Sequence, residues 1–323
     1  MWETARSGLY AFIKAMVSRL ATNVTTRVPQ PTGFKTASGV LLVLGITYGL
    51  NKAINSYALG HRRATDVWDW TREIVVVTGG SSGIGELIVR RLAQRGIKVV
   101  IIDINPPQDA LLPGVRFYEA DVSSPDAVGR AAERIRQDVG EPTVLINNAG
   151  IAMAVSILES TRDQIQRTFD VNTVSHFWLV KEFLPAMIKH NHGHVITMAS
   201  VASFIVIADI VCYSCAKASA MAFHEGLGQE LKHIYEARNI RTSIVHPYWV
   251  RTPMTAELVA GPGFKDAVLD PEQVAAAVVK QVLGGRSGQV VMPARCMIVA
   301  YSRAFPAWLQ EWMRDSKAGI YRK

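Results

Sequence analysis

Short β-branched runs alternate with longer helix-forming stretches over residues 72–293, and this alternation limits the possible folds more than any other feature of the chain. Each stretch between two runs is long enough for a crossover helix, so successive strands can lie parallel in one sheet with helices on both faces. The sequence therefore predicts an α/β fold with a doubly wound parallel sheet. Its strands would lie in EIVVVTGG, IKVVIIDI, VRFYEADV, PTVLINNAG, GHVITMAS, IRTSIVHP and GQVVMP.

The first run passes directly into a glycine-rich turn, TGGSSGIG, and then into a helical pattern, ELIVRRLAQRG. Gly79, Gly83 and Gly85 allow a sharp turn and close approach to a pyrophosphate, whose charge the amides at a helix N-terminus stabilise. With a strand before it and a helix after it, this loop is typical of a Rossmann-type dinucleotide site. We therefore predict cofactor contacts from Thr78, Gly79, Ser81, Ser82, Gly83, Ile84 and Gly85.

An acidic residue, Asp103, ends the second predicted strand. A carboxylate at this position can accept hydrogen bonds from the ribose hydroxyls of NAD and would repel the 2′-phosphate of NADP. The next residues, Ile104 and Asn105, supply no compensating cation. The sequence therefore predicts NAD as the preferred cofactor. A solvated acid at a strand end remains the alternative for Asp103.

Tyr213 and Lys217 stand four residues apart in YSCAK, on one side of a predicted helix. Hydride transfer at a carbinol carbon needs a group that moves the hydroxyl proton, and a free tyrosine with a pKa of about 10 is a weak base at neutral pH. The charge of Lys217 would favour the phenolate, and its ammonium could hold nicotinamide-ribose hydroxyls. Ser200, at the end of the preceding strand, would hydrogen-bond the substrate oxygen.

These motifs, together with NNAG at residues 147–150, resemble the short-chain dehydrogenase/reductase family over residues 72–295. The basic N-terminal extension and the long C-terminal tail are similar to its membrane-associated retinol and 17β-hydroxysteroid dehydrogenase-like branch. The resemblance implies that Asn172 holds a water linking Lys217 to solvent. The predicted catalytic residues are then Tyr213, Lys217, Ser200 and Asn172.

The resemblance also implies further cofactor contacts. Asp121 would contact adenine through its side chain and Val122 through its backbone, while the NNAG segment would be mainly structural. In that segment Asn147 would tie neighbouring strands together, and the residues after it would leave room for the adenosine. The implied contacts are Asp121, Val122, Asn148, Ala149, Gly150, Tyr213, Lys217, Pro247, Val250 and Thr252, of which Val250 and Thr252 match positions that hold the carboxamide.

One position departs from the family pattern. Tyr248 follows Pro247 where the family usually has glycine, and Trp249 comes next. Two aromatic side chains here predict an apolar wall at the substrate mouth. The Gly-Pro-Gly break at residues 261–263 interrupts two helical pieces and predicts a mobile lid.

The net charge of +8 is concentrated before residue 73, where nine Lys/Arg face three acidic residues. Residues 9–20 form one apolar helical face, while residues 36–51 carry no charge but fall short of the roughly 20 residues that span a bilayer. The C-terminal stretch adds Trp308 and Trp312. These features predict a monotopic anchor on endoplasmic reticulum or lipid droplets, with the catalytic domain in the cytosol. A mitochondrial transit peptide and an extra helix packed on the domain stay open as alternatives.

The sequence also argues against several classes of site. The remainder of the chain shows no basic stripe with interleaved aromatics, so nucleic-acid binding is not predicted. The odd number of cysteines implies no disulfide framework. The histidines lack metal-site spacing, so we predict no metal and interpret these residues as surface or packing residues: His176, His190, His192 and His194.

The predicted organisation is an N-terminal extension at 1–71, a single catalytic domain at 72–295 and an apolar, aromatic tail at 296–323. The predicted function is NAD-dependent hydride transfer to or from a lipophilic alcohol, ketone or aldehyde of the retinoid, steroid or fatty-alcohol type. A secondary-metabolite reductase, for example of a polyketide, is the main enzymatic alternative, and a non-catalytic nucleotide-binding scaffold is the alternative of another class. The family resemblance implies a possible homodimer or homotetramer.

Overall fold

The computed structural model describes residues 33–59, 68–261 and 264–320. The chain divides into two compact units, Met1–Ala58 and Leu59–Lys323. The described part of the first unit is one helix, α2 (Gly33–Ala58), which contains the uncharged stretch 36–51. Among the described residues, no helix combines the length and apolarity needed to cross a membrane. The predicted amphipathic helix at residues 9–20 lies outside the described residues.

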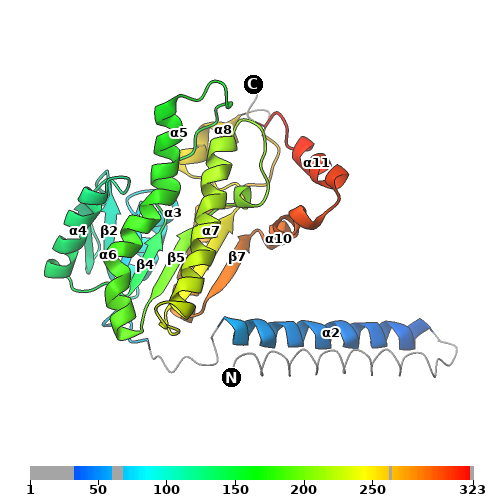
Figure 1. Ribbon diagram of the computed structural model, residues 1–323, viewed down its shortest axis with the longest axis horizontal. Helices are drawn as coiled ribbons and strands as arrows, with labels where there is room; N and C mark the ends of the chain where they lie inside the picture. The colour runs from blue at the N-terminus through cyan, green and yellow to red at the C-terminus, as the bar shows by residue number, and fades with distance from the viewer. Residues whose placement is uncertain (1–32, 60–67, 262–263, 321–323) are drawn as a thin grey trace. The chain divides into compact units, whose positions relative to one another are not determined.

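In the second unit, the described residues form one sheet of seven parallel strands in the order β3-β2-β1-β4-β5-β6-β7 (Figure 1). This confirms the predicted doubly wound sheet, because every predicted run holds one strand. The order reverses between β1 and β4, where the chain crosses from one half of the sheet to the other. The strands are β1 (Ile74–Thr78), β2 (Lys98–Asp103), β3 (Val115–Glu119), β4 (Val144–Asn147), β5 (His194–Met198), β6 (Arg241–Pro247) and β7 (Gly288–Met292).

Helices cover both faces of the sheet, and alternate strand residues serve the two faces. In β1, Val76 packs under α4, α6 and α7, whereas Val75 and Val77 pack under α3 and α9. Each face has its own apolar core, which explains why the central strands read as continuous apolar runs. These helices are α3 (Gly83–Ala93), α4 (Pro125–Asp138), α6 (Ser175–His190), α7 (Val211–His233) and α9 (Pro271–Gly284).

The remaining helices lie near the carboxyl ends of the strands or after β7. Helix α5 (Arg162–Phe169) begins with a capping box in which Thr161 and Gln164 exchange hydrogen bonds, and a π-helical turn (Asp170–Val174) joins it to α6. The other short helices are α8 (Ala256–Ala260), α10 (Met297–Ala300) and α11 (Ala307–Asp315).

An aromatic and charged cluster lies near the amino ends of the strands. Trp68 stacks on Trp70 with ring centroids 5.2 Å apart, and the His192 ring lies 4.4 Å from that of Trp68. Nε2 of His192 is 3.1 Å from the carboxylate of Glu73, whose side chain is buried. Burial raises the pKa of Glu73, but hydrogen bonds from His192 and Thr143 outweigh it, so the pKa lies below its usual value.

Candidate active site

A cavity of about 1540 Å³ lies at the carboxyl ends of the strands and extends from the glycine-rich loop to the start of α7. This is the edge at which open α/β sheets bind ligands, next to the reversal of strand order. Most of the predicted site residues line it. They are Gly79, Ser82, Gly83, Ile84, Asp103, Asp121, Val122, Asn148, Ala149, Gly150, Ser200, Tyr213, Lys217, Pro247, Val250 and Thr252.

Four predicted residues do not line the cavity and lie behind its wall: Thr78, Ser81, Gly85 and Asn172. Gly85 shows why such a position still matters. A Cβ at Gly85 would lie 2.0 Å from the carbonyl oxygen of Gly79 and 2.6 Å from Nδ2 of Asn148, so the first turn of α3 fits against the loop without room for a side chain. Gly79 itself has a φ of 64°, which favours glycine.

Thr78 and Asn148 hold the loop against the end of β4. The Thr78 hydroxyl accepts hydrogen bonds from the backbone N–H of Asn148 and of Ala149, both 3.0 Å. Nδ2 of Asn148 donates to the carbonyl oxygens of Thr78 and Gly79, also at 3.0 Å. Asn147 pairs with Thr197 in the register of β4 and β5, as expected of a residue that ties neighbouring strands, while its buried side-chain amide has no hydrogen-bond partner among the described residues.

Two carboxylates lie at the end of the cavity that the loop borders. Oδ2 of Asp103 accepts from the backbone N–H of Ser81 at 3.0 Å, and its other oxygen accepts from Asn105 at 3.2 Å. Asp121 forms an ion pair with Arg167, 2.7 Å apart, and no local sequence pattern predicts this pair. Burial raises the pKa of Asp121, but the hydrogen bond from Arg167 is among the effects that outweigh it and leave the pKa below its usual range.

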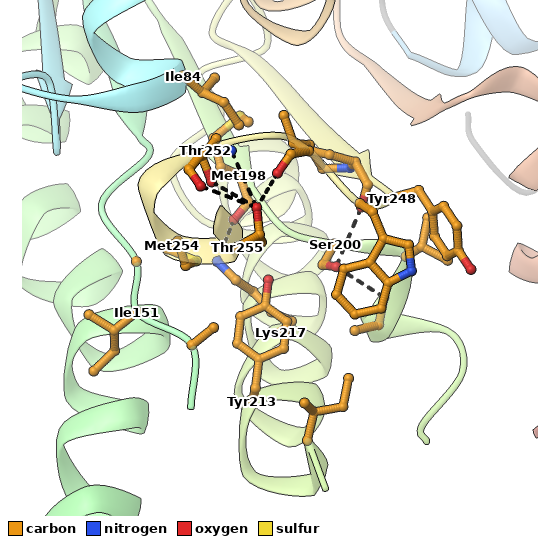
Figure 2. Close-up of a pocket in the computed structure, with 18 of the residues that line it drawn as sticks. Ile84, Ile151, Met198, Ser200, Tyr213, Lys217, Tyr248, Thr252, Met254 and Thr255 are labelled. Atoms are coloured by element: carbon orange, nitrogen blue, oxygen red, sulfur yellow. Dashed lines mark hydrogen bonds between the residues drawn. The ribbon is translucent and has the colours of Figure 1, made fainter. Parts of the chain in front are cut away.

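Tyr213 and Lys217 project from the first turns of α7 into the cavity, with Ser200 and Tyr248 beside them (Figure 2). Nζ of Lys217 lies 5.8 Å from the centre of the Tyr213 ring and donates to the carbonyl oxygen of Met198 at 3.0 Å. Lys217 is 4% exposed, and burial lowers its pKa to about 8. The spacing of four residues thus brings the phenol and the amine together, as expected for one helical turn.

The electrostatics of Tyr213 differ from the sequence expectation. Burial raises the pKa of Tyr213, and a hydrogen bond with Ser200 only partly opposes this effect. In the structure the phenol therefore keeps its proton more firmly than a free tyrosine, whereas the four-residue spacing predicts that Lys217 favours the phenolate. Ser200 sits at the end of β5, where its hydroxyl also accepts from the backbone N–H of Ala202 at 3.1 Å.

Asn172 lies in the π-helical turn and is fully buried. Its amide exchanges two hydrogen bonds with the backbone of Ile151 and donates a third to the carbonyl oxygen of Thr168 at 2.9 Å. A Cβ at Gly150 would lie 2.9 Å from Oδ1 of Asn172 and 3.4 Å from Nζ of Lys217. Asn172 and Lys217 therefore both lie next to Gly150, on the side to which a Cβ would project.

The segment after β6 forms another wall of the cavity. Val250 pairs with Leu269 in an isolated parallel bridge, and the Thr255 hydroxyl donates to the carbonyl oxygen of Val250. Thr252 donates its backbone N–H to the same hydroxyl at 3.3 Å. Tyr248, the residue at the usual glycine position, lines the cavity. Of the predicted lid break, residues 262–263 lie outside the described residues.

The histidines take several roles that sequence spacing did not separate. His176 and His194 are buried, and burial is the main effect that lowers the pKa of each to about 3, so both are neutral. His190 is exposed, and His192 pairs with the carboxylate of Glu73, which lies 119 positions away in the sequence. Within the described residues, no group of three or more His, Cys, Asp or Glu side chains is placed to hold a metal ion.

The loop has the features that a dinucleotide requires. Gly83 has a φ of 57° and borders the cavity, and a Cβ built there would meet nothing nearer than 3.7 Å. Ser82, the residue before α3, makes no side-chain capping bond, so its side chain leaves the amides at this helix end free for an anion. The residues present therefore fit a pyrophosphate at the loop and a ribose at Asp103.

Residues 73–263 match the short chain dehydrogenase family. The chain belongs to this family. Dehydrogenase RED2 of Cochliobolus heterostrophus is 44% identical over 207 residues, which cover 64% of this chain and 78% of that protein. Estradiol 17-beta-dehydrogenase 11 of Rattus norvegicus is 32% identical over 242 residues, or 72% of this chain and 80% of that protein. The solved structure of 4-hydroxyisoleucine dehydrogenase complexed with NADH shares the fold, with a TM-score of 0.62 and 20% identity over 68% of this chain and 96% of that one.

These relationships confirm the resemblance seen in the sequence, including its 17β-hydroxysteroid dehydrogenase-like branch. They make the chain an oxidoreductase of the alcohol and ketone type.

Proposed function

We propose that the chain transfers hydride between NAD and a lipophilic alcohol or ketone, with Ser200, Tyr213 and Lys217 as its catalytic residues. The observation that carries the proposal is the continuity of the cavity. One space joins Asp103 and the glycine-rich loop to the phenol of Tyr213, so a dinucleotide held at one end would reach the proton-transferring group at the other.

When bound, nicotinamide supplies or accepts the hydride, and the side chains of the chain manage the proton and the substrate oxygen. Ser200 orients that oxygen by a hydrogen bond, and the Tyr213 hydroxyl donates its proton to it when a carbonyl is reduced. The raised pKa of Tyr213 suits this direction, because the phenol carries the proton it must give. Oxidation of an alcohol requires the phenolate, which the ammonium of Lys217 stabilises.

The proposed cofactor preference rests on Asp103. Its carboxylate lines the cavity, and the residues that follow it there are Ile104 and Asn105, which are uncharged. A ribose with a free 2′-hydroxyl can donate to this carboxylate, whereas a 2′-phosphate meets its negative charge. NAD is therefore proposed over NADP.

Apolar side chains at the other end of the cavity support a lipophilic substrate. They come from several elements and surround the approach to Tyr213: Ile151, Met153, Ile205, Ile207, Met254, Leu258, Phe264 and Val299. The similarity to estradiol 17-beta-dehydrogenase 11 of the rat favours a ketone or alcohol of steroid-like polarity.

A membrane surface is the proposed location, on endoplasmic reticulum or lipid droplets. The support comes from exposed aromatic residues near the C-terminus, where Trp308 is 71% and Trp312 65% exposed. Amphipathic rings of this kind favour the membrane interface, and a lipophilic substrate concentrates there.

The test replaces Tyr213 with Phe in the full chain and follows NADH absorbance with a panel of hydrophobic ketones. Turnover should fall by roughly 10²- to 10⁴-fold, while NADH affinity measured by fluorescence titration stays the same. Tyr235→Phe, which removes the exposed hydroxyl bonded to Glu230 at the far end of the same helix, should leave both unchanged. Near-normal turnover of Tyr213→Phe refutes the catalytic assignment, and a wild-type preference for NADPH refutes the role of Asp103.

A further inference from the structure

The carboxylate of Asp266 joins two segments that lie far apart in the sequence. Its Oδ2 accepts from the Tyr248 hydroxyl at 2.6 Å and from Nε1 of Trp249 at 3.1 Å. Its Oδ1 lies 2.5 Å from Nζ of Lys317, which follows α11. One side chain thus holds the segment after β6 and the C-terminal segment, residues 297–320, to the same point.

All four of these residues line the cavity, so the link lies in its wall. The C-terminal segment contributes Trp312, Met313 and Ile320 to the same lining. Figure 2 shows Tyr248 next to Ser200, which places the wall beside the catalytic residues. The wall is therefore part of the substrate end of the cavity.

Aromatic side chains pack beside the residues that Asp266 joins. Phe264 meets the Trp249 ring edge-on with centroids 5.5 Å apart, and the Tyr248 and Trp249 rings are 5.8 Å apart. The Asp266 side chain is 18% exposed and that of Lys317 is 35% exposed, so solvent screens the ion pair only in part. A mostly buried carboxylate that loses its cation would keep only the two neutral donors, and the C-terminal segment would lose this attachment.

We propose that Asp266 is a specificity-determining residue, which holds Lys317 and the C-terminal segment in place so that Trp312, Met313 and Ile320 form an apolar wall for the distal part of a long substrate. This inference rests on the proposed function, because it assigns the substrate end of the same cavity. Substrates that reach the wall gain affinity from it, and short substrates do not. Asp266 acts through Lys317 and Tyr248 and does not touch the reacting atoms.

The test uses Lys317→Met, which keeps an unbranched apolar stem and removes the cation. Linear secondary alcohols of increasing chain length serve as probes, from butan-2-ol to dodecan-2-ol. The kcat/KM for the longest alcohol should fall roughly tenfold through KM, while that for the shortest should change by less than about twofold. Lys317→Arg, which keeps the charge, should restore the preference for long chains, and Asp266→Asn should behave as Lys317→Met does.

Glu311→Gln is the matched control, because Glu311 forms an exposed ion pair with Arg314 on the same helix. It should leave the chain-length preference unchanged. Unchanged preference in Lys317→Met overturns the proposal, as does a loss of equal size for short and long alcohols.

Amide hydrogen exchange of the full chain without substrate separates this proposal from the proposed function. Residues 297–320 should exchange faster in Lys317→Met than in the wild type or in Glu311→Gln. This comparison holds even if the wild-type protein oxidises none of the alcohols. Equal exchange rates in the wild type and in Lys317→Met show that Asp266 does not hold the segment, and they overturn the proposal.

Discussion

Replacing Gly85 with Ala tests how the cofactor loop is built. The added Cβ would lie 2.0 Å from the carbonyl oxygen of Gly79, whereas real Cβ contacts stay above about 3.0 Å, so the loop and α3 must separate by about 1 Å (3.0 − 2.0). The obstacles are the Gly79 backbone and Nδ2 of the Asn148 side chain, which its two hydrogen bonds hold in place. The separation would strain or break the two bonds from Nδ2 of Asn148.

The expected cost follows from these contacts. Overpacking costs about 1–3 kcal/mol, and each of two lost hydrogen bonds adds about 0.5–1.5 kcal/mol, for a total of about 2–6 kcal/mol. That is a large part of the roughly 5–15 kcal/mol that stabilises a typical domain. Because the loop also forms the proposed pyrophosphate site, NADH affinity should fall by at least about tenfold.

Urea unfolding and NADH titration of the full chain measure the two effects. Gly129→Ala on α4 is the matched control, since a Cβ there would meet only the Glu182 carboxylate at 3.7 Å. It should be neutral or stabilise the protein by up to about 1 kcal/mol. If Gly85→Ala unfolds at the wild-type urea concentration and binds NADH normally, the argument from loop packing is refuted.

Two further predictions concern buried charges. Burial lowers the pKa of Lys217 to about 8, so its ammonium destabilises the fold below that pH. Lys217→Met should therefore raise the free energy of unfolding by about 1–3 kcal/mol at pH 7 and by less at pH 10. The same substitution should abolish turnover. A lower melting temperature for this variant at pH 7 would contradict the assignment. The pKa of Glu73 lies below its usual 4.5, so the stabilisation from its charge is present above that value and is lost as the pH falls through the lowered pKa. Glu73→Gln should cost about 1–3 kcal/mol at pH 7 and progressively less as the pH falls below 4.5, as thermal melts across pH would show. A cost independent of pH would show that the charge of Glu73 is not involved.

Local sequence patterns were sufficient to predict the sheet and to place the central residues of the candidate site in one cavity. Buried parallel strands require apolar runs on both faces, and all seven runs were visible as such. The pairing of Tyr213 with Lys217 was predictable because helical geometry brings residues four apart onto one side. The position of Asp103 at the cavity followed from the end of its strand, since parallel strands end at one edge.

Features that depend on distant segments left no comparable pattern. The contact between Asp266 and Lys317 spans 51 positions, and that between Glu73 and His192 spans 119. In neither pair do both residues belong to the same helix or strand, so no helical or strand periodicity indicates the contact. The bonds from Nδ2 of Asn148 to Thr78 and Gly79 likewise span 70 and 69 positions, beyond the reach of a local pattern. The raised pKa of Tyr213 reflects burial, which the sequence around it does not specify.

Among the described residues between β6 and α9 there is one β-bridge, and it joins Val250 to Leu269 within that segment. The segment between those two residues carries cavity-lining side chains, yet none of it lies within the register of the seven-stranded sheet. Insertions or deletions there would change the shape of the substrate end without displacing a core strand. Changes in this segment would therefore alter the range of substrates while the proposed hydride-transfer residues and the core stay as they are.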